Sequence, residues 1–118
     1  MKGANEIARP VLRSMKPAVE RLEALLATQG ESALLRFSIG NAYLESSPAL
    51  AVEHLHRAVA LDPEYSAAWK LLGRALVANG AGVAARAAFE QGIEVAKRRG
   101  DVQAAKEMHV FLRRLQKE

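Results

Sequence analysis

The side chains best suited to hold a metal ion are three histidines, of which His54 and His56 are closest together. Two histidines on a helix chelate one ion when they lie on the same face, three or four residues apart. A spacing of two turns their side chains about 200° apart around a helix. We therefore predict solvated or partly packed histidines and no metal-binding residues.

A second candidate for chemistry is the glycine-containing run from Gly80 to Ala85, which imitates a dinucleotide-binding loop. Such a loop needs a β-strand before it and a βαβ unit around it, so that the pyrophosphate lies at a helix N-terminus. The residues before Gly80 instead have the apolar spacing of a helix, with Trp69 and Leu72 on it. We interpret the run as a turn between helices and predict no nucleotide or other cofactor.

The sequence contains no arrangement for nucleophilic or acid–base catalysis. Cysteine is absent, and no serine lies in a G-x-S-x-G turn. The carboxylates are spread singly along polar helix faces, where nothing would perturb their pKa values as catalysis requires. We predict a protein that is not an enzyme and has no catalytic residues.

Composition and charge limit the class of protein further. The chain has 118 residues, half of them hydrophobic and a quarter charged, which suits one globular domain. Its net charge is +4, but the only basic run, Lys97-Arg98-Arg99, stands where a helix end would favour cations. No apolar run approaches the roughly 20 residues of a membrane helix. We expect a cytoplasmic protein with no membrane partner, and this charge pattern disfavours nucleic acid as the partner.

The elements that position these residues are predicted to be helices separated by glycine, proline and asparagine. Residues 1–15 contain Pro10 and no sustained period, so they are predicted to be a mobile tail before a domain over residues 16–118. Ser47-Pro48 is typical of a helix start, and Gly100 of a helix end. The expected helices span 17–28, 32–45, 48–61, 65–78, 83–99 and 101–117.

A helix pair occurs twice along the chain. A shift of 33 residues superposes Ile39-Gly40 on Leu72-Gly73, and a shift of 34 superposes Ala51 and Leu55 on Ala85 and Phe89. Glycine in the middle of a helix costs about 1 kcal/mol relative to alanine. Gly40 and Gly73 therefore indicate close approach of the facing helix, in antiparallel pairs that stack on one another.

The second copy, Trp69-x2-Leu72-Gly73-x2-Leu76 followed by Ala85-x3-Phe89, resembles a tetratricopeptide repeat. The first copy adds Tyr43 and the closing Asp62-Pro63, whereas the second has no closing proline. The resemblance covers two repeats, about 33–65 and 66–99. It implies an all-α fold of antiparallel helical hairpins stacked as a short right-handed α-solenoid, with helix 17–28 before the repeats and a capping helix after them. We expect Trp69 to be largely buried.

A separate stripe of helix 32–45 is predicted to be functional, because it differs from the Ile39-Gly40-Tyr43 stripe that packs between helices. By the resemblance, this stripe and the matching stripe one repeat later line the concave face, where peptides bind. Apolar side chains beside two cations suit an amphipathic segment that carries Asp or Glu. The predicted peptide-binding groove consists of Leu34, Phe37, Asn41, Leu44, Lys70, Arg74 and Val77, with Ala67 on the same stripe.

The sequence therefore predicts a non-catalytic protein–protein interaction module that binds a peptide segment of a partner. Three alternatives remain open at this point. The stripe could be covered by the N-terminal segment, which would make it part of the core. The protein could be a self-associating adaptor, or a basic accessory protein associated with nucleic acid, whose binding would weaken steeply with salt. The sequence leaves the oligomeric state open.

Overall fold

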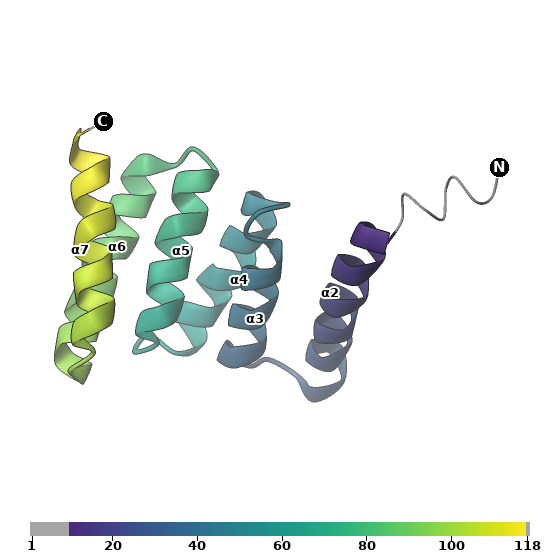
Figure 1. The fold of residues 1–118 in the computed structure, drawn as a ribbon. Helices are drawn as coiled ribbons and strands as arrows, with labels where there is room; N and C mark the ends of the chain where they lie inside the picture. The colour runs from purple at the N-terminus through teal and green to yellow at the C-terminus, as the bar shows by residue number, and fades with distance from the viewer. Residues whose placement is uncertain (1–9, 118) are drawn as a thin grey trace.

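The computed structural model describes residues 10–117, and every regular element in that range is a helix (Figure 1). Each helix runs antiparallel to the one before it, so that α3, α5 and α7 share one direction. The elements are α2 (Pro10–Gln29), α3 (Ala33–Tyr43), α4 (Pro48–Leu61), α5 (Ser66–Ala78), α6 (Gly82–Arg99) and α7 (Val102–Lys117). The all-α helical repeat fold is as predicted, and the run from Gly80 to Ala85 forms the turn into α6 and its first residues.

The first described helix begins at Pro10, well before the predicted start at Pro17. Both prolines fit the first turn of a helix, where the missing N–H costs no hydrogen bond. The helix continues through Pro17 at the loss of one backbone hydrogen bond. The predicted tail is therefore wrong for residues 10–15, and residues 1–9 lie outside the described range.

Helix ends form where the capping residues predict them. Pro48 occupies the first turn of α4 after Ser47, and Gly100 ends α6 with a φ of 72° in the left-handed region. Ser32 accepts a hydrogen bond from the Leu35 N–H at 3.2 Å, and Asp101 Oδ1 accepts one from the Ala104 N–H at 3.2 Å. These caps fix where α3 and α7 begin.

The mid-helix glycines lie against the large side chains predicted to face them. A Cβ on Gly40 would lie 2.5 Å from Leu55 Cγ, and one on Gly73 would lie 2.6 Å from Phe89 Cδ1. Both distances are far below van der Waals contact. The α3–α4 and α5–α6 pairs can therefore pack closely only because these positions lack a side chain.

The core runs through both repeats and into α7. Its fully buried large side chains are Phe89, Ile39, Leu55, Leu72, Met108 and Val95. Trp69 packs against this core and is neither fully buried nor exposed, so the larger part of its surface is covered, as expected. Its Nε1–H donates to the Pro63 carbonyl at 2.9 Å, which keeps the ring edge at the turn before α5.

The α2 helix is the most weakly attached of the described elements. It packs mainly against α3, and none of residues 18–29 is fully buried. Tyr43 donates its hydroxyl hydrogen to Glu23 Oε1 at 2.7 Å. In the connection to α3, Glu31 pairs with Arg36 at 2.6 Å and Arg57 at 3.1 Å, and these hydrogen bonds lower the pKa of Glu31 to about 2.

Candidate peptide-binding groove

The predicted stripe lies on the face formed by the parallel helices α3, α5 and α7 (Figure 1). Leu34 is 64% exposed and Val77 is 44% exposed, while Asn41 and Arg74 are also exposed. Phe37, Leu44, Ala67 and Lys70 are partly buried. Among the described residues the stripe is therefore an open surface with a partly packed centre, and α2 does not bury it.

An aromatic pair joins the two repeats on this face. Phe37 on α3 stacks on Tyr65, with the ring centroids 5.0 Å apart and an interplanar angle of 29°. Burial and the nearby charge of Asp62 raise the pKa of the Tyr65 phenol. Tyr65 was not among the predicted site residues, because it starts the predicted helix 65–78 without falling on its stripe of Ala67, Lys70, Arg74 and Val77. In the structure it precedes α5.

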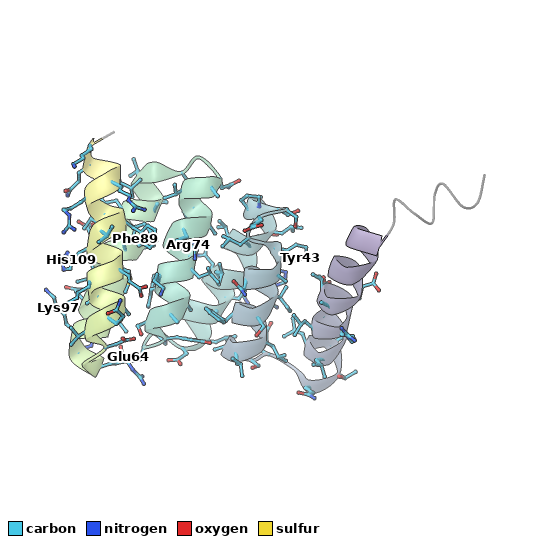
Figure 2. The ribbon with its side chains drawn as sticks, in the orientation of Figure 1. Tyr43, Glu64, Arg74, Phe89, Lys97 and His109 are labelled. Atoms are coloured by element: carbon cyan, nitrogen blue, oxygen red, sulfur yellow. The ribbon has the colours of Figure 1, made fainter. Side chains whose placement is uncertain are left out.

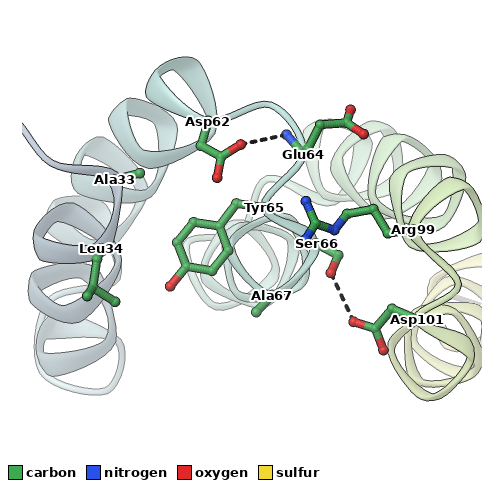
Figure 3. Close-up of a pocket in the computed structure, with 9 residues that line it drawn as sticks. All are labelled: Ala33, Leu34, Asp62, Glu64, Tyr65, Ser66, Ala67, Arg99 and Asp101. Carbon is green, nitrogen blue, oxygen red and sulfur yellow. Dashed lines mark hydrogen bonds between the residues drawn. The ribbon is translucent and has the colours of Figure 1, made fainter.

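One end of the face forms a cleft of about 580 Å³ where α3, α5 and α7 begin (Figure 3). The predicted residues Leu34 and Ala67 line it together with Tyr65. Polar residues complete its wall, namely Asp62, Glu64, Ser66, Arg99 and Asp101.

Hydrogen bonds occupy two of the carboxylates in this cleft. Ser66 Oγ donates to Asp101 Oδ2 at 3.0 Å, and the Glu64 N–H donates to Asp62 Oδ1 at 3.1 Å. Asp101 also caps α7, so these acids hold the helix ends in place.

The other end of the face forms a cleft of about 450 Å³. Leu44 and Arg74, both predicted site residues, line it with Glu45, Pro48 and Ala78. The predicted residues thus run from one cleft to the other along α3 and α5. We call this surface, including both clefts, the groove.

The two predicted cations of the groove, Lys70 and Arg74, have different surroundings. Lys70 Nζ lies 2.9 Å from Glu107 Oε1 on α7, so its charge already has a partner. Arg74 instead extends over the ring of Phe111, with its Cζ 5.9 Å from the ring centroid. Arg114, three residues further along α7, has its Cζ 5.7 Å from the same centroid. Phe111 and Arg114 were not among the predicted site residues, because the last helix was predicted only to cap the repeats.

The histidines do not form a site together. His54 Nδ1 lies 3.0 Å from Arg36 Nη1, and its ring stacks on Tyr43 at a centroid distance of 5.8 Å. Burial, followed by the charge of Arg36, lowers the pKa of His54. His56 is exposed. Within residues 10–117, no group of three or more His, Asp or Glu side chains could hold a metal ion.

A helix that spans a lipid bilayer must be both long and apolar. Over the described part of the chain, no helix is long and apolar enough to cross a membrane.

Comparisons with known proteins extend over most of the chain. A profile of the family described as Tetratricopeptide repeat matches residues 42–108, a span that includes α4, α5 and α6. The TPR repeat-containing protein PA0015 of Pseudomonas aeruginosa is 53% identical over 98 residues, which are 82% of this chain and 93% of that protein. The solution structure of protein BPP2914 from Bordetella parapertussis is similar with a TM-score of 0.74 and 47% identity, and the match covers 84% of this chain and 87% of that one.

Proposed function

Because the chain belongs to the tetratricopeptide repeat family, we propose that it holds an amphipathic segment of another protein in the groove along α3 and α5. Proteins of this family are generally non-catalytic interaction modules, and the fold implies protein partners. The observation that carries the proposal is the exposure of Leu34 beside the Phe37–Tyr65 pair and of Val77 near the far end of α5. Contiguous apolar surface rimmed by charge is typical of an interaction site.

Apolar contacts should supply most of the affinity. Full burial of a leucine or phenylalanine side chain is worth about 1.5–3 kcal/mol, whereas an exposed ion pair contributes about 0–1 kcal/mol. Leu34, Phe37 and Leu44 therefore act as the anchoring surface. The exposed Arg74 and Asn41 orient the segment and favour acidic or amide side chains on it.

A photo-crosslinking residue at Asn41, in the middle of the groove, tests this proposal. The matched control carries the same crosslinker at Gln91, an exposed residue of α6 that lines neither cleft. In cells, the position 41 crosslinker should label one defined segment of a partner, and a synthetic peptide of that segment should compete with the labelling. The position 91 crosslinker should not label that segment.

Phe37→Ala should then weaken binding of the synthetic segment by about tenfold or more, because one anchor is lost. The helical content should be unchanged, since Phe37 is only partly buried. Equal labelling from positions 41 and 91, or full affinity in Phe37→Ala, would rule out the groove as the binding surface.

A further inference from the structure

Two arginines from different helices each lie over the same aromatic ring, and one of them, Arg74, lines the groove. Arg74 projects from α5 and Arg114 from α7, and their Cζ atoms lie 5.9 Å and 5.7 Å from the centroid of Phe111. These distances are within the range of a cation–π interaction. The structure therefore brings one guanidinium group from α5 and one from α7 to the same ring, and Arg74 also lines the groove.

The ring under the two arginines is fixed to the core. Phe111 stacks on Phe89, with centroids 5.3 Å apart and an interplanar angle of 10°, and Phe89 is fully buried. Figure 2 labels Arg74, which belongs to α5, and Phe89, which belongs to α6. A guanidinium that rests on a fixed ring loses conformational freedom before a ligand arrives, while the hydrogen atoms of its planar fork stay available.

The positive charge at this place has no carboxylate against it in the described chain. The four ion pairs among the side chains described, residues 18–117, join Arg36 and Arg57 to Glu31, Lys70 to Glu107, and Arg98 to Glu64. Neither Arg74 nor Arg114 takes part. Glu45 lines the same cleft as Arg74, but it lies beyond ion-pair distance.

Lys70 differs from Arg74 in having a carboxylate partner on α7. Lys70 stands one helical turn before Arg74 on α5, and α7 supplies Glu107 to it at 2.9 Å. Beside Arg74, α7 supplies a second cation, Arg114, about two turns after Glu107, in place of an acid. Like charges repel, so an anion that contacts both arginines lowers the free energy of the site.

We infer that Arg74 and Arg114, supported by Phe111, bind a carboxylate side chain, Asp or Glu, of the segment held in the groove. The inference rests on the proposed function and names the chemistry that selects the segment. A carboxylate fits because each of its two oxygens can accept hydrogen bonds from one guanidinium fork. The Lys70–Glu107 pair leaves Lys70 with little part in this selection.

The first test examines the anion site without any peptide. Acetate is titrated into the full chain while the Nε–Hε signals of the arginines are followed by NMR, with sodium chloride at equal ionic strength as reference. The signals of Arg74 and Arg114 should shift together and saturate. Arg86, an exposed arginine of α6 outside the ion pairs named above, is the matched control and should shift weakly and without saturation. Equal responses from all three arginines would overturn the inference.

The second test measures the binding of peptides in the groove. Two acetylated and amidated octapeptides of leucine and alanine are compared, one with two glutamates and one with two glutamines in their place. The glutamate peptide should bind about tenfold more tightly, as expected for charge-assisted hydrogen bonds. Arg74→Gln combined with Arg114→Gln should bring the two peptides to equal affinity, whereas Arg86→Gln should preserve the preference for the glutamate peptide.

These outcomes separate the two proposals. If both peptides bind equally well, or if the preference survives in the double variant, the carboxylate site is wrong while the groove stands. If acetate shifts both arginine signals but neither peptide binds, the proposed groove function fails and the anion site stands. Inorganic phosphate in place of acetate distinguishes the anion classes, since tighter binding of phosphate would replace the carboxylate assignment.

Discussion

Gly73 lies in the middle of α5, where alanine would normally be the better helix former by about 1 kcal/mol. The ring of Phe89 occupies the space that an alanine Cβ would need, and Phe89 is itself fully buried between neighbouring helices. Gly73→Ala should therefore destabilise the protein by about 1–3 kcal/mol, because overpacking outweighs the gain in helix propensity. Urea unfolding of the variant measures this change.

Gly82→Ala is the matched control for this prediction. Gly82 starts α6, and an added Cβ there would meet no atom within 4 Å. This variant should unfold at the same urea concentration as the parent protein or a slightly higher one. If Gly73→Ala were equally stable, the close contact between α5 and α6 would not be as the structure has it.

At the scale of elements, local signals determined most of the fold. Ser47-Pro48 and Gly100 mark helix ends through backbone geometry that only certain residues adopt, and Gly40 and Gly73 mark the close helix contacts. The start of α2 could not be predicted in this way, since Pro10 and Pro17 satisfy the same rule. A local signal cannot choose between two residues that both fit it.

The groove was harder to predict than the helices, because its charges depend on contacts between elements. The stripe from Leu34 to Leu44 follows from helical periodicity within one segment. The pairing of Lys70 with Glu107 joins α5 to α7, and helical periodicity within one segment says nothing about such a pair. The same holds for Arg74 and Arg114 on Phe111. The residues of the surface were predictable, but their partners were not.

The attachment of α2 gives a prediction at this scale. In a stack of helices each element is stabilised mainly by its neighbours, and α2 has α3 as its main neighbour. Hydrogen exchange should therefore be faster in residues 18–29 than in α5 or α6, which contain most of the buried side chains. Leu22→Ala should accelerate exchange in α2 alone.

Leu72→Ala provides the comparison for that variant. Leu72 is almost fully buried in the core, so its truncation should cost about 2–5 kcal/mol and accelerate exchange in α5 and α6 as well. If Leu22→Ala accelerated exchange in every helix to the same extent, α2 would be part of one cooperative unit with the repeats.

Across the whole molecule, the apolar anchors of the groove lie apart from Lys97 of the basic run. Figure 2 shows Lys97 and His109 beside α6 and α7, at the end of the described chain farthest from α2. Arg98 in the same basic run pairs with Glu64 at 2.6 Å. Leu34 and Phe37 lie on α3, towards the other end. The apolar anchors and Lys97 therefore lie at different places along the stack, and of the basic run Arg99 lines one cleft of the groove.

Binding by the apolar anchors and binding by the basic run predict opposite responses to salt. A segment held by apolar contacts and two arginines should lose less than about tenfold in affinity between about 50 and 200 mM salt, whereas a nucleic acid bound through 6–10 phosphates would lose about 10³–10⁵. Lys97→Gln should leave the Kd of the crosslinked segment unchanged. Arg98 stays in place to preserve its pair with Glu64, and Arg99 stays because it lines one cleft of the groove. Isothermal titration calorimetry of that segment at the two salt concentrations measures both effects. A steep loss with salt, together with weaker binding by Lys97→Gln, would move the functional surface to the basic end and favour nucleic acid as the partner.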